Sequence, residues 1–149
     1  MNIFLKKIGA LCATLCLAVS LQAQGGIQFF EGTWEGAVAK AKKERKIIFM
    51  DAYATWCGPC KYLKQKVFVN GDVGAFYNKN FVNFAIDWES AAAAPLRNKY
   101  PLRAYPTLFL IDPATEQAVT KVEGALDAAN LIKFGEHGVD IAAGKQPQK

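Results

Sequence analysis

The sequence has few of the residues that metal sites need. It contains one histidine, His137, and four cysteines in 149 residues. Structural zinc normally takes four Cys or His ligands, and two of the cysteines, Cys12 and Cys16, lie in an N-terminal leader. Only a site shared between two chains would supply enough ligands. We therefore expect no metal, and we interpret His137 as a helix-surface residue.

Long apolar runs are also missing. The run from Ile8 to Leu21 has 14 residues, whereas a membrane-spanning helix needs about 20. It follows two lysines and ends near Ala23, a pattern typical of a secretory signal with a small residue at the cleavage point. The sequence predicts a signal peptide over 1–23, an exported domain over 24–149 and no membrane insertion of the mature chain.

The chain has no strong excess of one charge. It carries 18 Lys and Arg against 13 Asp and Glu, and two of these lysines belong to the leader. Such a small excess of positive charge excludes a nucleic-acid-binding protein, which would need a dense basic surface. With 52% hydrophobic residues and no repeat or linker, we predict one domain with a frayed tail over 144–149. The basic face at 40–45 indicates a solvated helix, or alternatively a docking patch for an acidic partner or anionic lipid.

Hydrophobic patterns predict an α/β fold. The run from Ile47 to Ala54 is nearly continuous, which is typical of a strand buried on both faces of a mainly parallel sheet. Other strands are expected over 27–30, 81–86, 107–111 and 118–122, and helices after Thr33, over 59–69, 73–77 and 95–100, and after Asp127. Gly135 and Gly138 should weaken the last helix. A parallel front half and a final antiparallel hairpin predict a three-layer α/β sandwich.

The mature chain keeps only Cys57 and Cys60, separated by Gly58 and Pro59. A disulfide across two residues closes too short a loop to stabilise much, so the pair is reactive or metal-binding rather than structural. Pro59 suits the first turn of a helix, which puts Cys57 at the N-cap and facing outward, and Cys60 on the inner stripe. Unpaired N–H groups at a helix start favour thiolate, so Cys57 is the expected nucleophile and Cys60 the resolving thiol.

Asp51 lies inside the apolar run that precedes the cysteines. A central strand has no side that faces solvent, and burial of an unpaired carboxyl raises its pKa. Asp51 is therefore a candidate proton acceptor for Cys60, directly or through water. The alternative is an aspartate at a strand end that reaches solvent.

These features resemble the thioredoxin family. The motif W-C-G-P-C-K at 56–61 follows a buried strand, and Asp51 precedes Cys57 by six residues. A Pro-Thr pair at 106 and 107 begins a later strand, and Gly124 follows the last one. The resemblance covers about 27–138.

The resemblance implies a thioredoxin fold, with a mixed central sheet flanked by helices, and Pro106 in the cis form. It also implies a substrate groove formed by Trp56, Tyr105, Pro106 and Gly124. Two positions depart from the family. Asn83 replaces a common lysine near the buried carboxylate, and Tyr105 replaces a common isoleucine, either offering a hydroxyl to the thiolate or filling space.

The stretch from Ala37 to Lys61 resembles exported domains akin to the C-terminal domain of the membrane thiol-disulfide interchange protein. This resemblance predicts a monomeric, periplasmic oxidoreductase that reduces disulfides in client proteins. No flavin or nicotinamide motif is present, so we expect no cofactor. Electrons must come from a separate protein donor, which can be membrane-bound. An oxidase or isomerase, and a peptide-binding module with inert cysteines, are the alternatives.

Overall fold

The structure is a computed structural model that describes residues 25–144. The predicted signal peptide and residues 145–149 of the predicted tail lie outside the described residues. The elements, in chain order, are α1 (Trp34–Glu44), β1 (Ile47–Tyr53), α2 (Gly58–Tyr62), the π-helical turn η1 (Leu63–Val67), α3 (Gly71–Asn80), β2 (Phe81–Asp87), the 3₁₀ turn η2 (Ala91–Ala93), α4 (Ala94–Arg97), β3 (Thr107–Asp112), β4 (Gln117–Glu123) and α5 (Ala128–Ala142).

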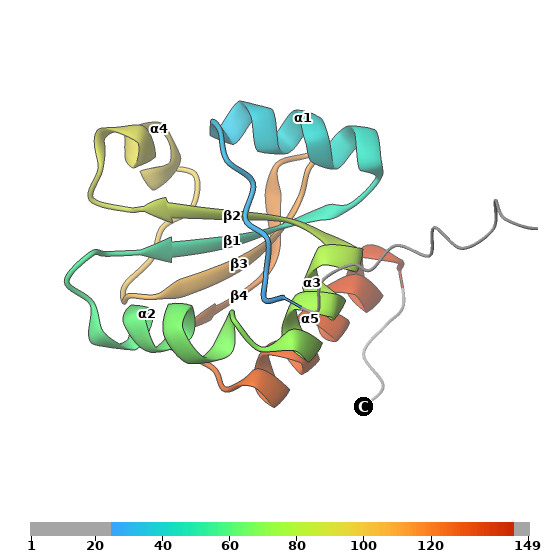
Figure 1. Cartoon of the computed structure of the whole chain (residues 1–149). Helices are drawn as coiled ribbons and strands as arrows, with labels where there is room; N and C mark the ends of the chain where they lie inside the picture. Colours follow the sequence, from blue (N-terminus) through green and yellow to red (C-terminus); the bar gives the residue numbers. More distant parts are fainter. Residues whose placement is uncertain (1–24, 145–149) are drawn as a thin grey trace, which may run out of the picture.

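The four strands form one mixed sheet in the order β2-β1-β3-β4. β1 pairs parallel with β2 and antiparallel with β3, and β3 pairs antiparallel with β4. α1 and α4 lie on one side of the sheet, and α2, α3 and α5 lie on the other (Figure 1). The predicted three-layer α/β sandwich is confirmed, with β1 as a central strand.

Alternation along β1 divides the core into two layers. Ile48, Met50 and Ala52 belong to the cluster that includes residues of α1 and α4. Phe49 belongs to the opposite cluster, with residues of η1, α3 and α5, and its ring lies 4.7 Å from that of Tyr77. Asp51 is two residues after Phe49, so it lies on the same face of the sheet, beneath the helix that follows the cysteines.

Side-chain caps set the helix starts. The Thr33 hydroxyl accepts a hydrogen bond from Gly36 N at the start of α1, and Asp127 accepts one from Asn130 N at the start of α5. Both caps confirm the sequence prediction. Asn70 Oδ1 accepts from the backbone N–H groups of Asp72 and Val73. This cap begins α3 at Gly71, so the helix predicted over 73–77 was too short.

Other helix and strand boundaries differ from those predicted, because contacts between distant parts of the chain determine them. The predicted strand over 27–30 is a single bridge between Phe29 and Asn83. The helix predicted over 59–69 divides into α2 and η1, and the one predicted over 95–100 forms as η2 and α4, ending at Arg97.

The glycines near the end of the chain do not interrupt α5. Gly135 and Gly138 are both buried within it. A Cβ atom at Gly138 would collide with the side chain of Leu110 on β3. The low helix propensity of glycine therefore does not end the helix at these positions, where close packing against the sheet leaves no room for a side chain.

Candidate active site

The two cysteines lie just after β1, where the chain turns into α2. Cys57 N donates to Ala54 O at 3.2 Å, which closes the turn. Cys57 is the N-cap of α2, and its Sγ accepts a hydrogen bond from Cys60 N at 3.1 Å. The pair forms a disulfide with a Cα–Cα distance of 5.3 Å. The predicted placement of Cys57 at a helix start is therefore confirmed.

The spacer residues follow from the same local geometry. Pro59 lies in the first turn of α2, where its missing N–H would have no helical partner. Gly58 is exposed, and a Cβ atom there would meet nothing within 4 Å. The fold does not require glycine at this position on steric grounds.

Cys57 does not face outward as the sequence predicted. The residue is 2% exposed, and Cys60 is 6% exposed. Both are in a small cluster with Ala54, against which Tyr53 and Tyr105 pack. Tyr105 belongs to a loop more than forty residues later in the chain, and no local pattern predicts its contact with the cysteine cluster.

Tyr105, Pro106 and Gly124 meet beside the cysteines. The Tyr105–Pro106 bond is cis, in agreement with the resemblance. Gly124 N donates to Pro106 O at 2.7 Å, and Gly124 has a φ of +95°, a conformation that favours glycine. The Tyr105 ring makes the contacts with the cysteine cluster, which favours the space-filling interpretation of this residue.

Trp56 is the exposed member of the site. Its side chain is on the surface, with 66% of the residue exposed. The ring lies edge-on to that of Tyr105, with centroids 5.8 Å apart, and its Nε1 donates to Glu89 Oε2 at 3.0 Å. The two aromatic residues predicted for the groove are therefore in contact.

Glu89 and Tyr53 are members of the site that sequence reasoning missed. Glu89 follows β2, and the ends of β1 and β2 lie side by side because the two strands are parallel. Trp88 N accordingly donates to Tyr53 O at 2.7 Å. Functional residues gather beyond the carboxyl ends of parallel strands. The position of Glu89, two residues after the second strand, could therefore have indicated that it belongs to the site.

Asp51 is buried under the same end of the sheet. Only 5% of the residue is exposed, and burial raises the pKa of its carboxyl to about 7. Its Oδ1 atom has no hydrogen-bond partner among residues 25–144. The structure thus places Asp51 as predicted and rules out the alternative of a solvent-facing aspartate.

Asn83 has a structural function that the sequence did not reveal. Its Nδ2 donates to Gln28 O at 3.2 Å and to Asn78 Oδ1 at 3.1 Å. Asn78 Oδ1 also accepts from Gln28 N. The two asparagines therefore fasten the segment that precedes α1 to the edge of the sheet.

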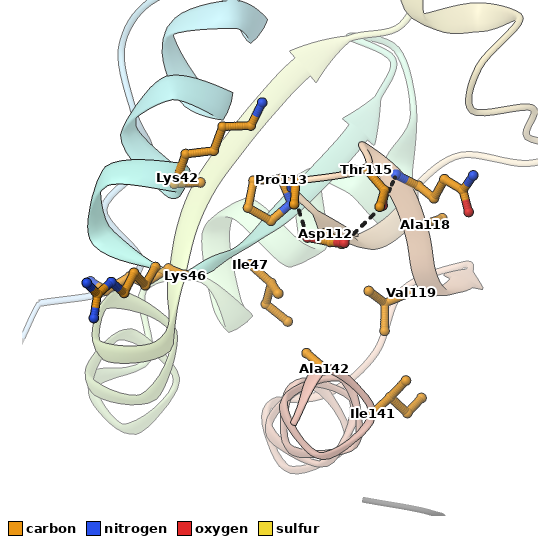
Figure 2. Close-up of a pocket in the computed structure, with 14 residues that line it drawn as sticks. Lys42, Lys46, Ile47, Asp112, Pro113, Thr115, Ala118, Val119, Ile141 and Ala142 are labelled. Atoms are coloured by element: carbon orange, nitrogen blue, oxygen red, sulfur yellow. Dashed lines mark hydrogen bonds between the residues drawn. The ribbon is translucent and has the colours of Figure 1, made fainter. Parts of the chain in front are cut away.

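A pocket of about 760 Å³ lies at the other end of the sheet. Ile47, the first residue of β1, lines it together with the β3–β4 turn and the end of α5 (Figure 2). Lys42 and Lys46 are on its rim. Because β1 begins at this pocket and ends at the cysteines, the pocket is separate from the redox site.

Within residues 25–144, no group of three His, Cys, Asp or Glu side chains is placed to hold a metal ion. None of the helices in that range has the length and apolar character to cross a membrane. His137 is exposed on α5, which confirms its surface position.

Comparison with known proteins assigns the chain to a family. The sequence model of the thioredoxin-like family matches residues 30–113. A candidate disulphide-isomerase from Bacteroides thetaiotaomicron, solved in solution, is 40% identical and superposes with a TM-score of 0.68 over 78% of this chain and 95% of its own.

Two other matches concern thiol:disulfide interchange proteins. DsbD 2 of Pseudomonas aeruginosa is 28% identical over 97 residues, which is 64% of this chain but 16% of that protein, so the chain spans about a sixth of its length. The C-terminal domain of Neisseria meningitidis DsbD has the same fold, with a TM-score of 0.58 at 21% identity over 70% of this chain and 91% of the domain. Fold, sequence model and a Cys-X-X-Cys pair at disulfide distance agree, and the chain belongs to the thioredoxin family.

Proposed function

We propose that the protein is an exported thiol-disulfide oxidoreductase that reduces disulfides of client proteins in the periplasm. The observation that carries the proposal is the position of Cys57 at the N-cap of α2, where Sγ accepts a hydrogen bond from Cys60 N. The same N–H group and the positive end of the helix would stabilise a thiolate on Cys57. A thiolate is the form of cysteine that attacks disulfides.

The reaction proceeds in two exchanges. The reduced Cys57 thiolate attacks one sulfur of the client disulfide, and the other client sulfur leaves as a thiolate that takes up a proton. Cys60 then attacks Cys57 Sγ, which breaks the mixed disulfide and releases the second client thiol. The client gains two electrons, and the Cys57–Cys60 pair loses two. A separate dithiol protein, the electron donor, reduces the pair again.

Asp51 accepts the proton that Cys60 must lose before it attacks. Its carboxyl lies on the sheet face covered by η1, the helical turn that follows Cys60, and its pKa of about 7 suits proton exchange near neutral pH. The proton then passes to the departing client thiolate. Asp51 is therefore the proposed acid and base of the resolving step.

The groove beside the cysteines receives the client. Tyr105 packs against the pair and Trp56 lies in contact with Tyr105, while Gly124, which has no side chain, bonds through its N–H to Pro106 O. An extended segment on either side of a client cysteine would lie along this backbone, much as a strand is added to a sheet edge. We propose that the protein acts as a monomer, because a single chain supplies all of these groups.

Three observations support the direction and the location. One of the matched relatives is a thiol:disulfide interchange protein, and the Gly58–Pro59 spacer resembles that of reducing members. Residues 1–23 have the pattern of a secretory signal. An oxidase or isomerase would use the same cysteines, and the identity of the redox partners distinguishes these activities.

A trapping experiment tests the proposal. The Cys60→Ser variant, expressed with its own leader, lacks the resolving thiol and should accumulate mixed disulfides through Cys57 that dissolve in dithiothreitol. The Cys57→Ser/Cys60→Ser double variant is the matched control and should trap nothing. A membrane dithiol donor among the trapped proteins supports reduction, and a quinone-linked oxidase supports oxidation. If the single variant traps nothing but binds unfolded chains non-covalently, the protein is a peptide-binding module.

A further inference from the structure

The disulfide is covered although its neighbour in sequence is highly exposed. Cys57 is 2% exposed, whereas Trp56 is 66% exposed. The residues that pack against the cysteine cluster are Tyr53, on β1, and Tyr105, in the loop before β3. Tyr105 is half-buried. Its ring therefore packs against the cysteine pair from the surface, where neighbouring residues must hold it in place.

Two contacts in series support the Tyr105 ring. The Trp56 ring lies edge-on to it, with centroids 5.8 Å apart and an interplanar angle of 81°. The Trp56 indole N–H in turn donates to Glu89 Oε2 at 3.0 Å. Aromatic pairs in this edge-to-face arrangement attract one another. The carboxylate of Glu89 therefore acts on the disulfide only through Trp56 and Tyr105.

Glu89 is held on a braced loop. Asp87 Oδ1 accepts from Glu89 N at 3.1 Å. Arg97 donates to the carbonyl oxygens on either side of Glu89, from Nε to Trp88 O at 3.0 Å and from Nη2 to Ser90 O at 2.7 Å. The backbone of Glu89 is thus fixed on both sides, although its side chain is exposed. Such bracing makes the carboxylate a pre-positioned acceptor for the indole N–H.

We propose that Glu89 is a positioning residue that holds an aromatic cap, formed by Trp56 and Tyr105, closed over the Cys57–Cys60 disulfide. The cap limits how fast an incoming thiolate reaches Cys57 Sγ. The inference rests on the proposed function in one respect, because it concerns the same cysteine pair. Access to the disulfide of the oxidised protein can be measured without any client.

The cap affects rates and leaves the equilibrium unchanged. A thiolate that reduces the disulfide must reach a sulfur that is now covered, so the Tyr105 ring has to move first. In this proposal the cap closes over the reduced pair as well, so the same opening precedes the reverse reaction, in which the reduced pair attacks another disulfide. A change in the opening equilibrium therefore multiplies the forward and reverse rate constants equally. The reduction potential of the pair stays the same.

Four variants test the cap. Glu89→Ala removes the acceptor, Glu89→Gln keeps an oxygen that can accept the same hydrogen bond, and Trp56→Phe keeps the ring but removes the donor. Glu136→Ala, at an exposed position on α5, is the control. The oxidised proteins are mixed with dithiothreitol, quenched with acid and alkylated, and the reduced fraction is counted by mass spectrometry. The reduction potential of each variant is measured against glutathione.

We expect Glu89→Ala and Trp56→Phe to be reduced about two- to tenfold faster than the parent protein, as expected from the loss of one surface hydrogen bond. Glu89→Gln and Glu136→Ala should react at the parental rate, and all potentials should agree. Parental rates in Glu89→Ala would overturn the inference. Equal acceleration in Glu89→Ala and Glu89→Gln would assign the effect to the charge of Glu89 and would also overturn the inference. A reduction potential that shifts together with the rate would assign the effect to thiolate stability and would overturn the inference as well.

The result is distinguishable from a failure of the proposed function. Reduction by dithiothreitol reports only on access to the pair, whereas trapping with Cys60→Ser reports on clients. If the rates follow the expected pattern and Cys60→Ser traps nothing, the cap is supported and the oxidoreductase function is contradicted. If clients are trapped but Glu89→Ala reacts at the parental rate, the function is supported and the cap is contradicted.

Discussion

Replacing Asp51 by asparagine should stabilise the protein at neutral pH and remove a pH dependence. Burial raises the pKa of Asp51 from 3.8 to about 7. Between these values the folded carboxyl is protonated while the unfolded one is ionised, so the folded state binds more protons. Stability therefore falls as the pH rises through this range, and the fall is complete above pH 7.

The magnitude follows from the size of the pKa shift. Each pKa unit corresponds to about 1.4 kcal/mol of difference between folded and unfolded states, so the shift of Asp51 costs roughly 4 kcal/mol above pH 7. This is a large part of the stability of an ordinary domain, about 5–15 kcal/mol. An asparagine amide keeps the shape of the carboxyl without its ionisation. A pH-independent offset of about 1–3 kcal/mol is expected if the buried amide lacks a partner.

Urea unfolding of the oxidised proteins at half-unit steps from pH 4 to 8.5 measures this difference. The disulfide keeps Cys57 and Cys60 from titrating in the same range. The free energy of unfolding of Asp51→Asn minus that of the parent should rise by roughly 4 kcal/mol across the range, with equal m-values. Glu136→Gln, on the exposed face of α5, should give a constant difference within about 0.5 kcal/mol. A constant difference for Asp51→Asn would refute the assignment of a raised pKa.

Three other predictions concern neighbouring parts of the site and the fold. In the reduced protein near pH 6, iodoacetamide should label Cys57 before Cys60, because Cys57 caps a helix and accepts a hydrogen bond from Cys60 N; equal labelling by mass spectrometry would contradict the roles of the two thiols. Gly124→Ala should cost about 1–2 kcal/mol in urea unfolding, since the φ of +95° is strained for alanine although the space is open. Asn70→Ala should cost about 0.5–2 kcal/mol, because α3 loses the side chain that accepts from two backbone N–H groups; an unchanged stability would mean that water replaces the cap.

The features that were predicted from the sequence depend on neighbours in the chain. The central strand is recognisable because a strand whose two faces are both covered by helices needs apolar residues on both faces, and β1 contributes residues to the core clusters on both sides of the sheet. Thr33 and Asp127 are recognisable because a cap bonds to N–H groups two or three residues ahead. The cysteine pair belongs to this class too, since the N-cap position of Cys57 follows from Pro59 and the turn before it.

The features that were missed depend on contacts between distant loops. Tyr105 packs against the cluster that contains Cys57, and Trp56 donates a hydrogen bond to Glu89. These residues come from three loops, since Trp56 and Cys57 share the turn after β1, and the loops meet because β1 has β2 on one side and β3 on the other. The strand order determines which loop ends are neighbours, and hydrophobic periodicity alone does not contain that order.

Asn83 shows how an edge contact and the proton chemistry are linked. The register places Asn83 opposite Phe49 and places Ala85 opposite Asp51, two residues further along both strands. The Asn83 amide bonds to Gln28 O and Asn78 Oδ1, and both are acceptors for its N–H groups. A lysine would replace this amide with a longer side chain that ends in an ammonium group. Holding the segment before α1 thus favours asparagine where many thioredoxins carry a cation. Burial consequently raises the pKa of Asp51 to about 7 without an opposing positive charge, which is the range that the proposed proton exchange with Cys60 requires.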